Sequence, residues 1–432
     1  MKILSTNTFT VPKDLSVITD YGVEQPAEMG GMSVKQIDKI WSAVQNLYKT
    51  GNHPMISMCL RRQGEVLLNR SIGYARGLNA DEGIDQQIAT VDTPVCLFSA
   101  TKLVTAMLIH LCDEKGLINL LDPISYYIPE YAKHGKRKTT IFHILSHRGG
   151  IPRLEGKIDP ELLFHKQEIL QRLYDAKPMS VSNSQLAYHA VTAGYILGEV
   201  LERVTGKSLN SLMNEYFAQP LDLPYFNYGL ADDYKSKVAK NYATGIYSKV
   251  LTDQYLNHLL GADLKTVVDI TNDPRFMDVV SPAANMFTSA EQINRFMQML
   301  LNGGEYHGRQ IMSAQTVFRA TIPSSGFMLD RSLLVPMRYA LGPMLGHNPI
   351  GLFGPKTGQA FGHLGFSNIL CWADPQRDIS VSILTTGKSI LGTHLPYLAQ
   401  VLYQISTQCP NIEVNQRRRI LFASDQNSME KI

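Results

Sequence analysis

Apolar and polar positions along this chain predict strands near its two ends and helices in its middle. Apolar residues recur at helical spacing over 33–49, which predicts a helix that opens at Ser33. Two partly alternating segments then flank Gln63-Gly64, a pattern that is typical of a β-hairpin. Further strand-like segments lie at 339–345, 362–374 and 379–387.

The predicted helices occupy the middle of the chain and one segment near its end. They run from Ser99 to a stop at Gly116, over 160–175, 190–204 and roughly 254–270, from Ser289 to Asn302, and over 392–406. A sheet assembled from the two ends, with a helical region inserted between them, predicts an α/β (α+β) fold. We place the discontinuous sheet domain at 1–95 and 280–410, the helical domain at 96–279 and a loose C-terminal tail at 411–432.

Ser99 and Lys102 form the most informative pair in the chain. Positions i and i+3 share one face of a helix, with Cβ atoms about 5–6 Å apart, so the lysine amine can reach the serine hydroxyl. Backbone N–H groups of the first helical turn also favour negative charge. The pair therefore predicts a nucleophile, its base and part of an oxyanion hole in one short segment.

A structural alternative exists for this pair. The spacing alone is weak, since Ser428 and Lys431 repeat it in a polar segment. Ser99 would then be only a helix N-cap, and Lys102 only a solvated residue of the first turn. The apolar run that follows Lys102 distinguishes the first pair from the second, because it predicts a buried helix behind Ser99.

Two further segments supply the groups that a serine–lysine pair requires. Tyr188 directly precedes the predicted helix 190–204 and is the candidate to help move the serine proton, although a packing role is the plain alternative. Glycines flank His363 at the start of a strand, so backbone there can approach a ligand closely. The N–H of Phe366 would then complete the oxyanion hole with that of Ser99, unless the glycines mark a simple bulge.

Ser-Ala-Thr-Lys at 99–102, Tyr-His-Ala at 188–190 and His-Leu-Gly at 363–365 resemble the SxxK, YxN and KTG motifs of the serine β-lactamase and penicillin-binding-protein superfamily. Segments around these motifs extend the resemblance over most of 54–400. It implies an antiparallel sheet flanked by helices, with an inserted, mostly helical domain. It also implies that Ser99 attacks an acyl carbon and that Lys102 and Tyr188 take its proton. The N–H groups of Ser99 and of Phe366, the residue after Gly365, would stabilise the oxyanion.

Two departures from the family motifs indicate which branch of the superfamily the chain resembles. Ala190 stands where the family has the asparagine of YxN, and His363 stands where it has the lysine of KTG. Both losses resemble the class C β-lactamase-like carboxylesterases of the family VIII type and the related acyltransferases. His363 would orient the substrate carbonyl or the leaving group. We interpret a literal Lys-Thr-Gly at 356–358 as a loop, because the strand that the motif should open follows Gly365.

Composition excludes several other classes. The net charge of +3, from 41 Lys and Arg against 38 Asp and Glu, gives no case for nucleic acid or an anionic membrane as partner. No apolar window approaches the roughly 18 residues of a membrane span, and the N-terminal segment lacks the pattern of a secretory signal. Five widely spaced cysteines fit a reducing compartment, so we expect a cytoplasmic protein.

Two other motifs bear on the chemistry of the chain. His143 and His147 have the i, i+4 spacing of a metal pair, but no glutamate follows His143 as in HExxH, so no metal and no cofactor are expected. A GxSxG nucleophile elbow is absent from the sequence, which removes the basis for an α/β-hydrolase.

The sequence therefore predicts a serine hydrolase that cleaves small carboxylic esters through an acyl-serine intermediate, with a capacity for acyl transfer. Its partner would be a small ester or acyl substrate, and the oligomeric state stays open. A β-lactamase or D,D-peptidase is the second enzyme hypothesis, although cell-wall substrates would require export. A catalytically silent scaffold or ligand-binding protein is the non-enzyme alternative. Ester hydrolysis measured beside cephalosporin hydrolysis distinguishes the three.

Overall fold

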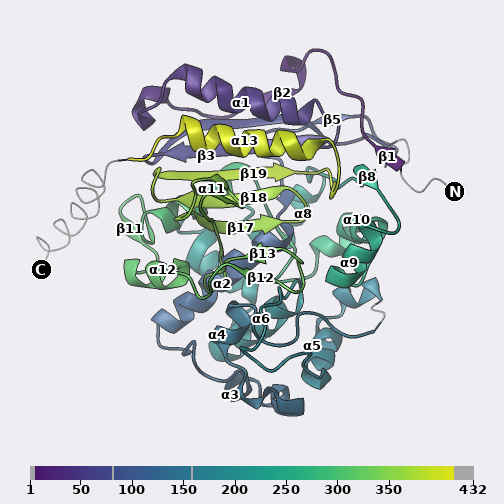
Figure 1. Cartoon of the computed structure of the whole chain (residues 1–432), viewed down its shortest axis with the longest axis vertical. Coiled ribbons are helices and arrows are strands. Elements are labelled where there is room, and N and C mark those ends of the chain that lie inside the picture. Colours follow the sequence, from purple (N-terminus) through teal and green to yellow (C-terminus); the bar gives the residue numbers. More distant parts are fainter. Residues whose placement is uncertain (1–4, 80–81, 157–158, 413–432) are drawn as a thin grey trace, which may run out of the picture.

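Strands from both ends of the chain meet in one antiparallel sheet, in a computed structural model that describes residues 5–79, 82–156 and 159–412 (Figure 1). The order is β14-β17-β18-β19-β3-β4-β2, with β5 paired to β4. These strands are β2 (Thr19–Tyr21), β3 (Met55–Arg62), β4 (Glu65–Arg76), β5 (Gln87–Ile88), β14 (Met344–Leu345), β17 (Phe361–Gly365), β18 (Ile369–Asp374) and β19 (Ile379–Thr385). The predicted mixed α/β fold class with an antiparallel sheet is confirmed.

The two faces of the sheet are covered by different helices. Helices α1 (Val34–Tyr48) and α13 (His394–Gln408) cover the outer face (Figure 1), and α11 (Ala290–Leu301) packs on the other. Alternate side chains of a strand point to opposite faces. Accordingly, Met58 of β3 joins the core under α1 and α13, whereas Cys59 joins the core under α11. The strand is therefore buried on both sides, which explains its nearly continuous apolar sequence.

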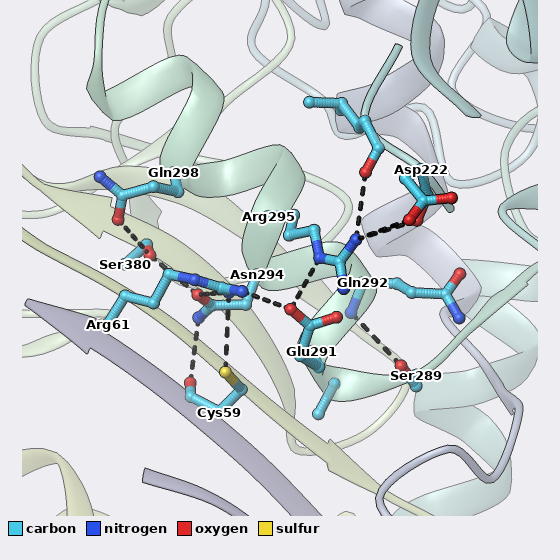
Figure 2. Close-up of polar contacts among 12 residues, drawn as sticks. Cys59, Arg61, Asp222, Ser289, Glu291, Gln292, Asn294, Arg295, Gln298 and Ser380 are labelled. Carbon is cyan, nitrogen blue, oxygen red and sulfur yellow. Dashed lines mark hydrogen bonds and ion pairs between the residues drawn. The ribbon is translucent and has the colours of Figure 1, made fainter. Parts of the chain in front are cut away.

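A buried polar network fixes α11 to the sheet (Figure 2). Arg61 of β3 donates to Asn294 of α11 at 2.7 Å and pairs with Glu291. Glu291 also accepts from Arg295 at 2.7 Å, and Arg295 donates to the carbonyl of Asp222 at 2.9 Å. Burial alone would raise the pKa of Glu291, but the two guanidinium groups outweigh burial and hold that pKa below its usual value.

The middle of the chain is mostly helical, and its helix α2 (Thr101–Glu114) packs against α6 (Thr192–Thr205). The other helices described are α3 (Ile124–Tyr127), α4 (Ile141–Leu145), α5 (Lys166–Asp175), α7 (Leu209–Met213), α8 (Asp232–Lys235), α9 (Thr252–Leu260), α10 (Leu264–Asn272) and α12 (Ala314–Thr321). Among the described residues, no helix has the length and apolar character that crossing a membrane demands.

Short strands outside the main sheet connect these elements. They are β1 (Ser5–Asn7) with β8 (Gly245–Tyr247), β6 (Val95–Cys96) and β7 (Asn227–Tyr228) on either side of β9 (Met286–Thr288), β10 (Glu305–Tyr306) with β11 (Arg309–Gln310), β12 (Met328–Leu329) with β13 (Pro336–Met337), and β15 (Ile350–Gly351) with β16 (Gly354–Pro355).

Local signals placed several element boundaries well. Ser33 precedes α1, the turn Gln63-Gly64 joins β3 and β4, and Ser289 accepts a hydrogen bond from the N–H of Gln292 at the start of α11. The backbone of Gln63 and Gly64 is left-handed, with φ of 53° and 85°, which suits a tight hairpin turn. The predicted loose tail lies, from residue 413 onward, outside the described residues.

Three predicted elements were wrong because each is divided. Gly261, with φ of 78°, ends α9, so the expected helix at 254–270 is the pair α9 and α10. A 3₁₀ helix over Pro160–Phe164 precedes α5 in the expected helix 160–175. The strand expected at 362–374 is the hairpin of β17 and β18, in which Asn368 takes the left-handed conformation.

Candidate active site

Ser99 lies in a 3₁₀ turn (Phe98–Ala100) directly ahead of α2, and Lys102 lies in the first turn of that helix. The Lys102 Nζ lies 3.0 Å from Ser99 Oγ and donates to the carbonyl of Ala283 at 3.0 Å. The N-cap position of α2 is occupied by Ala100, and Ser99 Oγ accepts from Lys102 Nζ. Ser99 is therefore not the N-cap of α2, and its contact with Lys102 is one that a nucleophile and its base could make.

Burial prepares Lys102 to act as a base. Its side chain is 6% exposed, and burial lowers the pKa of its amine well below the usual value for lysine. No carboxylate contributes to the shift in this pKa. The amine is therefore neutral over a range in which an exposed lysine is charged, and a neutral amine can accept the proton of Ser99.

Close backbone packing holds Ser99 in place. Phe98, the residue before the serine, has φ of 49°, a conformation that is rare for a large side chain. A Cβ atom on Gly365 would lie 2.3 Å from the carbonyl oxygen of Leu97, so only glycine lets β17 pass this close. The same approach brings Phe366 beside the serine, where its ring lies 5.7 Å from that of Phe98.

Tyr188 comes together with the serine–lysine pair. The Lys102 Nζ lies 5.0 Å from the centre of the Tyr188 ring, and both Ser99 and Tyr188 line the same cavity. Burial raises the pKa of Tyr188, and the nearby Ser99 hydroxyl partly opposes this rise. The buried phenol oxygen has no hydrogen-bond partner of regular geometry. It is therefore free to exchange a proton with a group that enters beside Ser99.

Asp330 positions Tyr188 and was missed by the sequence analysis. Its carboxylate accepts from the backbone N–H of Tyr188 at 3.1 Å and from the hydroxyl of Tyr339 at 3.0 Å. Asp330 is fully buried between β12 and β13. The sequence does single out Asp330, because it is the one acidic residue between Glu305 and Asp374.

His363 lies behind the pair and does not line the cavity. It is fully buried, its Nδ1 contacts the carbonyl of Leu364 at 2.7 Å, and its ring lies 6.2 Å from that of Tyr188. Burial, and next the proximity of Lys102, lower the pKa of His363 to about 3. The imidazole is therefore neutral and lies beside Tyr188 and Lys102.

His147 is a second buried histidine beside Tyr188. Its ring lies 4.7 Å from Tyr188 and 4.8 Å from Tyr339, and its Nδ1 accepts from the N–H of His189 at 3.3 Å. Since Nδ1 is an acceptor, Nε2 carries the proton of the neutral ring. His147 thus packs against Tyr188, whereas His143, its partner in the possible metal pair, caps α4 with Thr140. Within the described residues, no group of three or more His, Cys, Asp or Glu could hold a metal ion.

A cavity of about 610 Å³ opens beside Ser99. Its walls come from β17 and the following turn, from the segment around Tyr188, and from α9 and α10. The lining is mainly apolar and includes Ala190, where the family has asparagine. Arg153 is the single cationic side chain among the described lining residues, and its guanidinium donates to the carbonyl of His258 at 3.2 Å.

The Lys-Thr-Gly sequence at 356–358 does not contribute to the cavity wall. Lys356-Thr357-Gly358 follows β16, and Thr357 donates to the carbonyl of Gly354 at 2.8 Å, so these residues form a turn and are not among those that line the cavity. Ser428 and Lys431 lie outside the described residues.

Comparison with known proteins shows the family of the chain. The family profile described as Beta-lactamase matches residues 41–399. The protein described as Esterase/beta-lactamase LipL, from Mycobacterium tuberculosis, is 29% identical over 307 residues, which cover 68% of this chain and 70% of that protein. The resemblance that the three motifs predicted is thus confirmed.

Two solved structures have the same fold. A family VIII carboxylesterase matches with a TM-score of 0.73 at 25% identity, over 87% of this chain and 99% of that one. A penicillin-binding protein homologue from Caulobacter crescentus matches with a TM-score of 0.72 at 22% identity, over 88% of this chain and 99% of that one. The second similarity concerns the fold alone.

Proposed function

The chain belongs to the beta-lactamase family and is a serine hydrolase of that fold, and we propose that it cleaves small, uncharged carboxylic esters through an acyl-serine intermediate on Ser99. The observation that carries this proposal is the 3.0 Å contact between Ser99 and a buried, neutral Lys102 at the wall of an apolar cavity. This contact supplies an activated nucleophile where an ester can enter.

The acylation step follows from these positions. Ser99 Oγ attacks the acyl carbon while its proton passes to Lys102 Nζ, and the carbonyl π electrons move to oxygen. The N–H groups of Ser99 and Phe366 would stabilise the resulting oxyanion. The intermediate then expels the alkoxide, which takes a proton from Tyr188 or from the lysine ammonium, so that a neutral alcohol leaves.

Deacylation repeats the step with water. A water molecule gives a proton to Lys102 or Tyr188 and its oxygen attacks the acyl carbon, after which Ser99 Oγ leaves and recovers a proton. An alcohol in place of water would give acyl transfer. In this mechanism His363 and His147 support Tyr188 and Lys102 from behind, where both are neutral, and neither touches the substrate.

The lining of the cavity favours neutral esters over β-lactams and cell-wall peptides. Those alternatives carry a carboxylate, which requires a fixed cation, and His363 is neutral in the place of the family lysine. Arg153, the single cation among the described lining residues, donates to the carbonyl of His258. The five buried free cysteines are compatible with the expected cytoplasmic location.

Ester and β-lactam turnover by the same preparation tests the proposal. We expect hydrolysis of p-nitrophenyl butyrate, weak turnover of nitrocefin, and covalent labelling by a fluorophosphonate that Ser99→Ala abolishes. Ser428→Ala is the matched control, since it removes the serine of the other Ser-x-x-Lys sequence and should leave labelling unchanged. Fast nitrocefin hydrolysis without ester hydrolysis would reject the ester assignment, and labelling that survives Ser99→Ala would reject the nucleophile.

A further inference from the structure

The hairpin of β12 and β13 exposes an unusual number of apolar side chains. Five of them are between 43% and 57% exposed within nine residues, namely Phe327, Met328, Leu329, Leu334 and Val335. Soluble proteins expose single apolar side chains commonly, but a contiguous group marks an interaction surface. We call residues 327–335 the apolar hairpin.

The apolar hairpin is attached directly to the active site. Asp330 folds its tip inward by accepting from the N–H groups of Ser332 and Leu333 at 2.8 and 2.9 Å. The same carboxylate holds the backbone of Tyr188, and the side chain of Leu333 lines the cavity. In Figure 1 the hairpin lies where the sheet meets the helical region. One short segment therefore has an apolar outer side and forms part of the cavity wall.

Two arginines lie in or against the apolar hairpin. Between Glu305 and Asp374 the single acidic residue is Asp330, and it is fully buried. Arg331 is exposed within the hairpin, and Arg148 reaches the sulfur of Met328 at 3.4 Å. The overall net charge of +3 gave no reason to expect an anionic partner, because a sum over the whole chain does not show where Arg148 and Arg331 lie.

We propose that the apolar hairpin docks on the surface of an anionic phospholipid bilayer and presents the cavity to esters dissolved there. Exposed apolar side chains enter the interface while neighbouring arginines contact the headgroups, which is the combination that peripheral membrane binding uses. A second copy of this chain is the alternative occupant, which gel filtration of the wild type and the hairpin variant distinguishes. The bilayer contact stands on its own observations, and only the delivery of esters rests on the proposed function.

Vesicle sedimentation tests the docking surface. The full-length protein should co-sediment with vesicles of phosphatidylglycerol and phosphatidylcholine in equal amounts, bind weakly to pure phosphatidylcholine, and dissociate as salt is raised. Leu329→Ser/Val335→Ser should reduce binding by roughly tenfold or more. Val17→Ser/Val23→Ser is the matched control, since these exposed valines (63% and 78%) lie far along the chain from the hairpin, and it should bind like the wild type.

Further measurements distinguish binding to a bilayer from dimerisation of the chain. Arg331→Glu should weaken binding to the anionic vesicles and reduce its salt dependence. Absence of binding by the wild type, or equal binding by the hairpin variant, would overturn the proposal, as would a dimer in gel filtration that the hairpin variant loses. Hydrolysis of soluble p-nitrophenyl acetate and the unfolding temperature are measured on every sample. A protein that binds vesicles and lacks esterase activity would reject the proposed function and leave the docking surface intact.

Discussion

At the scale of single residues, the chemistry depends on how far burial changes the basicity of one amine. Lys102 is enclosed by apolar groups, keeps a carbonyl and a hydroxyl as its polar contacts, and has its pKa lowered by burial. An ordinary lysine has a pKa of about 10.4 and would be protonated in the assay. In the proposed mechanism it is therefore the environment, more than the residue type, that makes Lys102 a base.

The first prediction concerns that environment. Lys102→Arg should reduce kcat/KM for p-nitrophenyl butyrate about 10²–10⁴-fold, because a guanidinium stays protonated and cannot accept the proton. In the wild type, kcat/KM should rise with pH and reach its plateau well below pH 10. Lys115→Arg, at the exposed end of α2, is the control and should leave kcat/KM unchanged. A rising limb centred near the pKa of a free lysine would contradict the assignment.

Tyr188 gives a second prediction at this scale. Tyr188→Phe should lower kcat about 10²-fold or more, because the phenol proton is then missing when the alcohol leaves. The free energy of unfolding should change little, since the removed hydroxyl is buried without a partner. Tyr195→Phe is the matched control, because its hydroxyl is also buried and unpartnered but Tyr195 does not line the cavity. Equal kcat values for the two variants would remove Tyr188 from the mechanism.

At the scale of elements, buried charged side chains hold α11 against the sheet. Because they are buried, the loss of one of them leaves the others without a counterion. Glu291 neutralises Arg61 and Arg295, which donate to it from β3 and from the same helix. A buried ion pair adds little net stability against an apolar replacement, but loss of one partner leaves an uncompensated charge. The network shown in Figure 2 therefore specifies the packing of α11 more than it strengthens it.

The third prediction tests this network. Glu291→Gln should lower the free energy of unfolding by about 3 kcal/mol, because two buried guanidinium groups lose their counterion. Urea denaturation at neutral pH measures the change. Glu168→Gln removes a carboxylate that pairs with Arg172 on the surface of α5, and this control should cost less than about 0.5 kcal/mol. Similar losses for both variants would show that the buried network contributes no more than a surface pair.

At the scale of the whole molecule, the number of buried neutral imidazoles stands out. The buried histidines are His53, His110, His147, His189, His363 and His394. Burial is the largest cause of the lowered pKa in each. These pKa values fall to about 3 for His53 and His363 and to about 4 for His110, His189 and His394, against about 6.5 in an unfolded chain.

The fourth prediction is acid sensitivity of the fold. Below pH 6.5 the unfolded chain binds protons that the folded chain does not, so each buried histidine lowers stability by up to about 1.4 kcal/mol per pH unit until its folded pKa is reached. Above pH 6.5 the effect vanishes. The free energy of unfolding should therefore fall steeply between pH 6.5 and pH 5.

Two variants test the origin of this slope. His110→Gln keeps a donor for the carbonyl of Leu341 and should flatten the pH dependence by about one proton, even if it changes stability at pH 7.5. His134→Asn, at an exposed position, should leave the slope as it is. A flat profile for the wild type between pH 5 and pH 6.5 would contradict the prediction.

Much of this protein was predictable from the sequence because the signals are local. The contact of Ser99 with Lys102 depends on the three-residue spacing within one helical turn, and caps such as Ser33 and Ser289 act over a few residues. The order of apolar segments also predicted a sheet assembled from the two ends of the chain. The division of 254–270 at Gly261 was missed, since a single glycine within an apolar pattern does not by itself end a helix.

Tertiary structure alone decided the features that depend on packing between distant segments. Tyr188 is held by Asp330, 142 residues away along the chain, and the pKa of Lys102 is lowered by side chains from several elements. The inward position of His363 and the exposed face of the apolar hairpin are likewise properties of the assembled core. Spacing along a helix is fixed by covalent geometry, whereas burial and desolvation exist only after the chain has closed around a residue.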